Sequence, residues 1–543
     1  MKKTFLPLIA LLLFSCSSKH PSSQSSGEVS SQTSSQEATS LTSEESSPSE
    51  SLSRDIDRGG VTQTTIAQYY TDLTEHSAYT VDSAPTIGYT KVLVVPVWFT
   101  DSPDYVLDRD LVHEDIELAY FGDEGEIGWH SVKSFYETES LDYLYMEGTV
   151  SEWYELDEPM AAYGVGAGQN KTVSLAKEAT DWFFSAHEEE DRRDYDGDGD
   201  GYIDAVMLIY AAPDYVSLRR EECPNLWAYC YWYQSPREHN VKAPGVNTFF
   251  WASYDFIYDR DTALTRAGTG FGLGDCRNCV VDSHTFIHEF GHCLGLDDYY
   301  DYGPNGYSAA ASFSMQDHNI GGHDPFSLLS FGWVDPFIPT ESCSIEITPF
   351  QNEHDLILLT PEWNDFDSPF DEYLLIELFT PTGLNELDCR YKYAGSYSKG
   401  PNRTGIRLWH VDARLLYVER DENFTETQMT SDALIDAYYG VTQAFTNTYG
   451  DEDYGSPLGS DYDKFDLLHL IRNSKTMTYK TSKDLEANNL FYDGDSFDMS
   501  TYSKQFGKSG KLDSGSQLGW SFEVAIEDSG ASALATISLT KAD

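Results

Sequence analysis

Basic residues, long apolar runs and cysteines are all scarce in this chain. Its 543 residues include 35 lysines and arginines against 90 aspartates and glutamates, so the formal net charge is −55. This balance argues against a nucleic-acid-binding protein, because phosphate recognition needs clustered basic side chains. It also argues against electrostatic attachment to an anionic lipid surface. The charge instead suits a soluble protein that meets divalent cations or basic partners.

The clearest membrane-related signal lies at the very start of the chain. Lys2 and Lys3 precede an apolar run over 5–14, which is too short for a permanent bilayer-spanning helix and therefore predicts a secretion signal. Ser15 and Cys16 follow at once and resemble a bacterial lipobox, whose cysteine is lipidated and becomes the mature N-terminus. We predict a lipoprotein signal peptide over 1–16, with an ordinary cleaved signal as the alternative.

The composition then divides the chain into a tether and a folded body. Residues 17–55 are dominated by serine and predict a disordered tether, because almost nothing there can be buried. Residues 56–84 read as a linker or a short pro-segment. In the whole chain 40% of residues are hydrophobic and 14% aromatic, which is enough for a packed core. We place a catalytic domain at 85–340 and a mostly β region at 341–543.

Hydrophobic periodicity predicts α/β layering in the first part of the body. Apolar, β-branched residues over 91–101 and 205–212 predict buried strands, and Pro96 suggests that the first is an edge strand or carries a bulge. Apolar steps of three and four residues predict a helix over 172–187. Residues 131–137 predict a short helix and 143–156 a hairpin. After about residue 340, short strands between turn residues predict a mostly β structure, over 355–360, 373–379, 405–411, 521–526 and 533–539.

Seven cysteines remain after the signal, and export would permit disulfides. Two pairs are close enough in sequence to bond locally, Cys223 with Cys230 and Cys276 with Cys279. The second pair forms a CxxC, but no second CxxC or thioredoxin-like context accompanies it, so a zinc ribbon is not expected. An odd count leaves one thiol over, and Cys293 is the best candidate for a buried free thiol.

The most informative segment is HEFGHCLGLDD, which begins at His288. A helix turns by about 100° per residue, so His288 and His292 lie on one face and can share a zinc ion. Glu289 lies at the edge of that face, where it can reach a metal-bound water. A random chain of this composition would contain the pattern, with its glycine and following acid, roughly four times in ten thousand.

A third ligand would follow the turn made by Gly295, since glycine takes the left-handed C′ geometry without a Cβ clash. Asp298 stands ten residues after His288 and is our choice, because a carboxylate oxygen is an acceptable zinc ligand. Three protein ligands would leave one position open for water, as in catalytic zinc sites. The alternative third ligands are Asp297, His284, His318, His323 and Cys293.

These residues resemble the metal-binding signature of the immune inhibitor A-like peptidases, the M6 family. The resemblance implies an exported bacterial, zincin-like (metzincin-type) protease with zinc on His288, His292 and Asp298, and with Glu289 as catalytic base. It also implies a Met-turn at Met315, protein or peptide substrates, and host proteins among them. Segments around 91–101, 131–156, 405–414 and 489–497 resemble other landmarks of the family. His410 and Asp412 within them are interpreted as structural, with a role at the rim of the site as the alternative.

A second metal site is predicted in the segment DYDGDGDGYID over 194–204. Carboxylates alternate with glycine there, and hard oxygen ligands with Gly201 at the turn suit Ca²⁺. The expected ligands are Asp196, Asp198, Asp200, the backbone carbonyl of Tyr202, and Asp204. Met207 stands where an EF-hand has its bidentate glutamate, so the loop is not an EF-hand. An acidic solvated turn is the alternative.

Together these observations predict a zinc metalloendopeptidase at the cell envelope. It would be lipid-anchored through Cys16 and face outward, or be released, and it would have no nucleic-acid partner. Two other functions stay open: a catalytically silent surface adhesin or binding protein on a protease scaffold, and a metal-dependent hydrolase of a non-peptide bond. The oligomeric state and the cleavage preference do not follow from the sequence.

Overall fold

The computed structural model describes most of the chain from residue 84 onward. The described residues are 84–102, 108–123, 125–127, 129–163, 169–212, 226, 228–232, 239–258, 281–300, 308–363, 371–393, 398–413, 467–478, 484–507 and 510–542, with backbone strands at 63–64, 415–420, 426–430 and 441–444. The predicted signal peptide with Cys16, the tether, and the cysteines Cys223, Cys276 and Cys279 lie outside these ranges.

A mostly parallel sheet forms the first half of the structure, in the strand order β3-β2-β6-β9-β7. All neighbours pair in parallel except β7 and β9, which are antiparallel. The short strand β4 also pairs in parallel with β2. The strands are β2 (Gly88–Trp98), β3 (Leu144–Val150), β4 (Tyr154–Glu155), β6 (Val206–Tyr210), β7 (Tyr229–Trp232) and β9 (Thr248–Ser253).

Two expectations about this sheet were wrong. Residues 143–156 form no hairpin, because β3 and β4 both run alongside β2 in parallel. Of the two alternatives for Pro96, the edge strand was wrong, because β2 lies between β3 and β6. The pairing with β3 ends at Val94 and the pairing with β4 begins at Val97. Pro96 therefore lies in a gap between two partners, where its missing N–H costs no ladder hydrogen bond on that side.

Helices cover both faces of this sheet because its central strand is apolar on both sides. In β2, Leu93 and Val95 contribute to the core beneath α4 (Gln169–Ala186), whereas Val92 and Val94 contribute to the core on the other face. Successive side chains of a strand point to opposite faces, so an uninterrupted apolar run serves two layers. The second face is covered by α2 (Arg109–Phe121), α3 (Val132–Glu139) and α6 (His284–Cys293).

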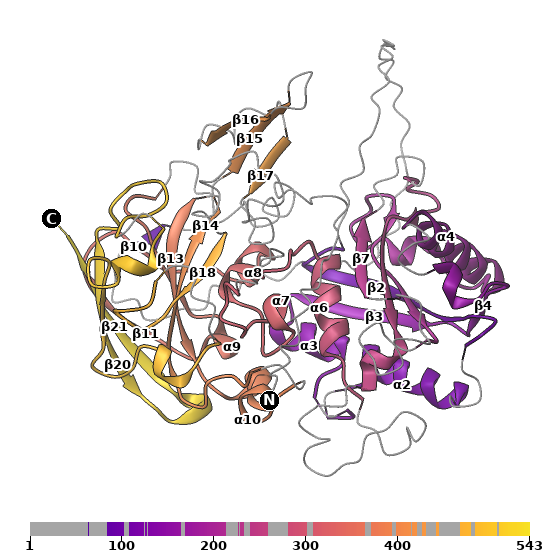
Figure 1. The fold of residues 1–543 in the computed structure, drawn as a ribbon, viewed down its shortest axis with the longest axis horizontal. Coiled ribbons are helices and arrows are strands. Elements are labelled where there is room, and N and C mark those ends of the chain that lie inside the picture. The colour runs from indigo at the N-terminus through magenta and orange to yellow at the C-terminus, as the bar shows by residue number, and fades with distance from the viewer. Residues whose placement is uncertain are drawn as a thin grey trace, which may run out of the picture.

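The C-terminal part contributes two antiparallel sheets that pack on each other. Their orders are β12-β13-β14-β18 and β11-β21-β20-β19, and one buried cluster fills the space between them. Figure 1 shows these sheets and α4 on opposite sides of the first sheet. The strands are β11 (Cys343–Ile347), β12 (Leu356–Leu359), β13 (Glu372–Phe379), β14 (Gly405–Asp412), β18 (Leu468–Ile471), β19 (Ser496–Asp498), β20 (Trp520–Glu527) and β21 (Leu534–Lys541).

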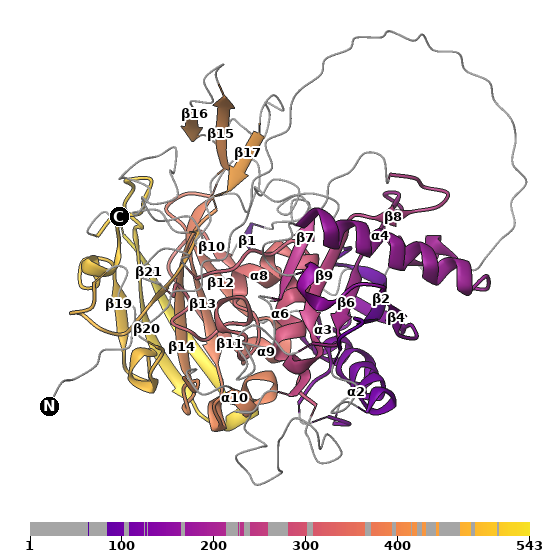
Figure 2. The same ribbon diagram turned by 45° about the vertical axis from the view of Figure 1, so that its right-hand side comes forward.

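One core joins the two halves of the molecule. In β13, Leu374 and Ile376 face the second C-terminal sheet, while Tyr373 and Leu375 belong to the cluster that also contains α6 residues such as Phe290. Figure 2 shows α6 between the first sheet and strands β12 and β13. The helix that carries the HExxH motif is therefore packed from both sides.

Shorter elements complete the fold. They are β1 (Gln63–Thr64), β5 (Tyr202–Ile203), β8 (Gly245–Val246), β10 (Ile338–Pro339), β15 (Leu415–Arg420), β16 (Glu426–Thr430), β17 (Val441–Ala444), α7 (Met315–His318), α8 (Pro325–Ser330), α9 (Phe350–Glu353) and α10 (Glu386–Arg390). Within the part of the chain that the structure describes, no helix combines the length and the apolar character needed to cross a bilayer.

His410 joins β13 and β14 to the loop at Asp513 through a buried ion pair. Its Nε2 lies 2.7 Å from Oε1 of Glu372, and the same carboxylate accepts hydrogen bonds from the backbone amides of Asp513 and Ser514. Burial alone would lower the pKa of His410, but Glu372, Asp513 and Asp412 outweigh burial and raise it to about 9. This is the structural role expected for His410 on its strand.

We expect the stability of the protein to fall when His410 loses its proton. An unfolded histidine has a pKa of about 6.5, so this contribution is fully present below about pH 6.5 and is lost as the pH rises through about 9. The melting temperature (Tm) measured from pH 7 to pH 10 should therefore fall more steeply for the wild type than for His410→Gln. Parallel curves for the two proteins would contradict this role.

Candidate metal centre

Helix α6 carries the HExxH residues and ends in a turn that returns the chain toward them. The amide of Gly295 donates to the carbonyl of His292 (2.9 Å), and the amide of Leu296 donates to the carbonyl of Gly291 (3.0 Å). These two bonds form a Schellman motif, which needs a left-handed residue, and Gly295 has φ +101°. The glycine predicted to end the helix therefore makes the turn that leads to Asp298.

The turn brings the three predicted zinc ligands together. Nε2 of His288 lies 2.9 Å and Nε2 of His292 lies 3.5 Å from Oδ1 of Asp298. The two imidazole rings are nearly perpendicular, with centroids 4.8 Å apart. All three side chains are buried, as is Glu289 on the same helix. The arrangement is that of a site in which one atom from each residue can approach a common ion.

Two backbone carbonyls determine which nitrogen of each histidine faces Asp298. Nδ1 of His288 lies 2.7 Å from the carbonyl oxygen of Met315, and Nδ1 of His292 lies 2.7 Å from that of Leu296. A carbonyl can only accept, so each Nδ1 carries a proton, and in the neutral ring the lone pair lies on Nε2. Both imidazoles can therefore bind a metal through Nε2, as is expected of a pair of zinc ligands.

The segment predicted as a Met-turn lies directly against α6. Met315 is fully buried at the start of α7, and its carbonyl is the acceptor for His288. Gln316, the next residue, lies with its Nε2 3.4 Å from Nδ1 of His292. A Cβ on Gly291 would come within 2.5 Å of Oε1 of Gln316. Glycine at position 291 therefore leaves space for the side chain of Gln316 beside His292.

The candidate ligands and Glu289 shift one another's pKa values. Burial alone would raise the pKa of Asp298, but His292 and His288 outweigh it and hold that pKa well below its usual range. Burial would lower the pKa of His292, but Asp298 outweighs it and raises that pKa to about 10. Burial raises the pKa of Glu289, with the two imidazoles opposing it. A buried carboxylate between two imidazoles is a ready acceptor of positive charge.

The other histidines considered as third ligands have partners of their own. His318 pairs with Asp317 (2.7 Å), and His323 pairs with Glu139 (2.5 Å). His284 lies 2.9 Å from Asp282 and 3.2 Å from Asp388.

His284 is held between two aromatic rings as well as between two acids. Its ring stacks on Trp129 with centroids 3.9 Å apart and on Tyr393 with centroids 4.4 Å apart. Burial would lower the pKa of His284, but Asp282 and Asp388 outweigh it and raise that pKa to about 10. The residue is therefore a buried cation that supports the first turn of α6.

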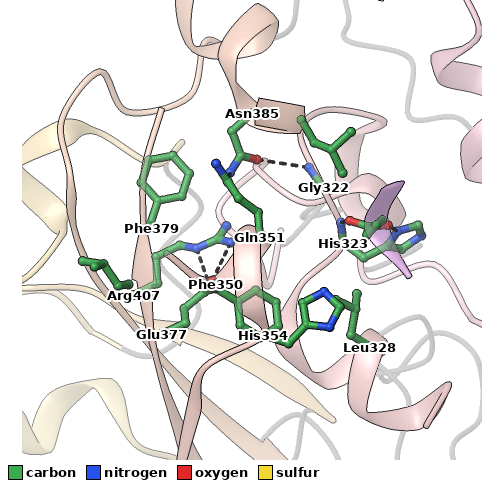
Figure 3. A pocket seen from close by; sticks show the side chains of 13 residues that line it. Gly322, His323, Leu328, Phe350, Gln351, His354, Glu377, Phe379, Asn385 and Arg407 are labelled. Carbon is green, nitrogen blue, oxygen red and sulfur yellow. Dashed lines mark hydrogen bonds and ion pairs between the residues drawn. The ribbon is translucent and has the colours of Figure 1, made fainter. Parts of the chain in front are cut away.

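Behind the ligands, Gln316 lies between His292 and His323, and His323 lines a small cavity. Oε1 of Gln316 lies 3.3 Å from Nε2 of His323, whose Nδ1 contacts Glu139. His323 and Glu139 line the cavity together with Glu377 and Arg407 of the C-terminal sheet, as Figure 3 shows for the labelled residues. Sequence reasoning missed Glu139 and Gln316, because no local pattern indicates a contact between residues so far apart in the chain.

The predicted calcium loop is only partly assembled as a ligand group. Carboxylate oxygens of Asp196, Asp198 and Asp204 lie within 4.8 Å of one another. Asp200 does not join them, and its Oδ1 instead accepts the amide of Tyr202 at 2.8 Å. The glycine at position 201 takes the left-handed conformation expected for the turn, with φ +92°.

The electrostatics of this loop fit a bound cation. Oδ1 of Asp196 is buried and makes no hydrogen bond. Burial raises the pKa of Asp204 well above its usual value, and Asp198 and Asp196 add to the effect. Burial and the Asp196 carboxylate likewise raise the pKa of Asp198. Three crowded acids with one unused oxygen are the donor set that Ca²⁺ takes, since it prefers hard oxygen ligands.

The chain matches a known family over part of its length. Residues 90–217 match the family model described as the catalytic domain of the immune inhibitor A peptidases, M6. The matched range contains most of β2, all of β6 and the acidic loop, and it ends before α6.

Two bacterial proteins are similar over longer stretches. Immune inhibitor A of Bacillus thuringiensis subsp. alesti is 25% identical over 243 residues, which cover 39% of this chain and 33% of that protein. The pre-pro-metalloprotease PrtV of Vibrio cholerae serotype O1 is 27% identical over 297 residues, which cover 46% of this chain and 29% of that protein. The alignments thus span about a third of the length of these relatives.

Among solved structures, OgpA from Akkermansia muciniphila aligns at 13% identity with a TM-score of 0.22, over 64% of this chain and 93% of that one. A score that low supports no statement about this chain. The family match and the two relatives confirm the resemblance to the M6 peptidases. Over residues 90–217 the chain is similar to the catalytic domain of the immune inhibitor A-like M6 peptidases.

Proposed function

We propose that this protein is a zinc metalloendopeptidase that cleaves peptide bonds of extracellular proteins. The observation that carries the proposal is the pair of imidazoles whose Nδ1 atoms are held by backbone carbonyls while their Nε2 atoms face Asp298. Two nitrogen donors and one carboxylate oxygen suit zinc and leave a coordination position open. The metalloprotease names of the relatives support the same reaction class.

The mechanism assigns His288, His292 and Asp298 as ligands and Glu289 as general base. Bound zinc would supply Lewis-acid chemistry, polarising the scissile carbonyl and lowering the pKa of a water molecule. Glu289 takes the proton of the attacking water and passes it to the leaving amine. Its burial limits bulk water around the proton that it carries. Met315 acts below the site as a metzincin-type Met-turn, positioning His288 through its carbonyl.

We also propose that Asp196, Asp198 and Asp204 hold a structural calcium ion, with the carbonyl of Tyr202 and Asp200 as further candidates. The loop precedes β6 and bonds to β2, because Thr90 donates to Asp204 at 2.9 Å. A cation there would relieve repulsion among three crowded acids, of which Asp196 and Asp204 are buried. Its role would be stability, since the loop contributes no residue to the zinc group.

Location and organisation belong to the same proposal. We propose export through the signal at 1–16, a lipid anchor at Cys16, and a serine-rich tether over 17–55 that holds the enzyme outside the cell. Residues 85–340 would carry the chemistry. The region 341–543 would support α6 through the shared core and through Asp388, which contacts His284.

Replacing Glu289 by Gln should abolish proteolysis while leaving zinc bound. The amide keeps the shape of the side chain but cannot take a proton, so casein cleavage should fall by at least about a hundredfold. Zinc measured by elemental analysis should stay near one ion per chain. Substantial residual cleavage would refute the role of Glu289. A wild-type protein that binds zinc but shows no chelator-sensitive cleavage would favour the silent binding protein instead.

Asp298→Ala should lower zinc affinity by more than about tenfold, because it removes one of three ligands. The matched control is Asp297→Ala, which removes the neighbouring acid without touching the ligand group. Competition with a zinc-sensitive dye gives both affinities. Equal zinc content and affinity in the two variants would remove Asp298 from the site.

Calcium should raise the Tm of the zinc-loaded protein by about 5 °C at saturating concentration, since an ion bound only to the folded state stabilises it by mass action. Asp196→Asn should lose most of this response, whereas Asp194→Asn, an exposed neighbour outside the group, should keep it. Asp200→Asn reports whether that residue is a ligand. A wild type that does not respond to calcium would refute the calcium site.

A further inference from the structure

Two thiols meet where α6 packs against the edge of the first sheet. Cys293 is the last residue of α6 and is fully buried, and Cys230 lies on the edge strand β7, half-buried. Their sulfur atoms are 3.7 Å apart, although 63 positions separate them in the sequence. Figures 1 and 2 show β7 beside α6. The described sulfur that Cys230 contacts therefore comes from a distant segment of the chain, while Cys223 lies outside the described residues.

The contact between the two cysteines lies between the edge of the first sheet and the helix that carries the candidate metal ligands. Cys293 follows the zinc-ligand candidate His292 directly, and its carbonyl accepts the amide of Ala84 at 2.8 Å. Strand β7 is the outermost strand of its sheet and pairs only with β9 among the described strands. A link at this point would join the free edge of the sheet to the end of the helix that carries the metal ligands.

We propose that Cys230 and Cys293 form a disulfide bond in the exported protein. The contact distance exceeds the length of an S–S bond, about 2.05 Å, by an amount that small side-chain and backbone movements can close. The proposal rests on the export that forms part of the proposed function, because an oxidising compartment maintains such bonds.

The chemistry requires a disulfide-containing oxidant, either a small molecule or a thiol–disulfide oxidoreductase. One cysteine thiolate attacks the oxidant, forms a mixed disulfide and releases one thiol; the second thiolate attacks the mixed disulfide and releases the other. Two protons and two electrons leave the cysteine pair, and the oxidant is reduced to two thiols. Since Cys293 is fully buried in the finished fold, the exchange would take place before the core closes.

The bond would restrict the segment that matters most for the chemistry. The loop that it closes, from 230 to 293, contains β9 and all of α6, and therefore His288, Glu289 and His292. Closing a loop of this length removes many unfolded conformations and so stabilises the folded state. The link would also hold β7 against the helix, at the edge of the sheet that no other described strand covers.

Peptide mapping of the full exported chain tests the bond directly. The protein is unfolded without reductant, free thiols are alkylated, and the digest is analysed by mass spectrometry. We expect a linked peptide pair containing Cys230 and Cys293, neither of them alkylated. Alkylation of both, or a bond from Cys230 to another cysteine such as Cys223, would overturn the proposal.

The effect of a reductant on thermal unfolding is a second readout. It can be measured on the wild type and so does not require a variant that folds. A dithiol reductant should lower the Tm of the wild type by about 5 °C or more. Cys230→Ser should remove this difference, and Cys343→Ser, a matched change on β11, should retain it. An unchanged wild-type Tm would overturn the proposal even if Cys230→Ser failed to fold.

The outcomes separate this inference from the proposed function. A protein with the mapped bond but without chelator-sensitive proteolysis would refute only the peptidase. An active, zinc-dependent protease with both thiols alkylated would refute only the disulfide.

Discussion

The hydrogen bonds from two ring nitrogens to backbone carbonyls are the constraint on which the site depends. They fix the tautomers of His288 and His292, and they exist only because the chain folds back twice onto α6. The Schellman turn at Gly295 supplies the carbonyl of Leu296, and the segment at α7 supplies that of Met315. Any change that moves either carbonyl would alter both the direction and the basicity of a ligand.

The described charged side chains around α6 include acids that are buried and paired with histidines. Asp282 and Asp388 enclose the imidazolium of His284, and aromatic rings cover its faces. Glu372 is neutralised by His410 and by two backbone amides. Unpaired charges would cost several kcal/mol each in such places, so pairing is the condition for packing two halves around one helix.

Local patterns were sufficient for the elements and ligands that depend on nearby residues. The helix expected at 172–187 is α4 (Gln169–Ala186), and the spacing of His288, His292 and Asp298 correctly anticipated their convergence. The errors concern partners that are distant in the chain. The hairpin predicted at 143–156 was wrong, because both of its strands pair in parallel with β2. No local sequence pattern indicates the contact of Cys230 with Cys293 or the position of Gln316 beside His292.

The contacts of Asp388 carry a consequence for how such a protein can be divided. One carboxylate oxygen of Asp388 contacts both Nε2 of His284 on α6 and the amide of Gly321. Excising residues 85–340 as a minimal enzyme would strip these anchors and expose one side of a shared core. Natural or engineered rearrangements that keep the fold intact should therefore retain residues 85–340 and 341–543 together.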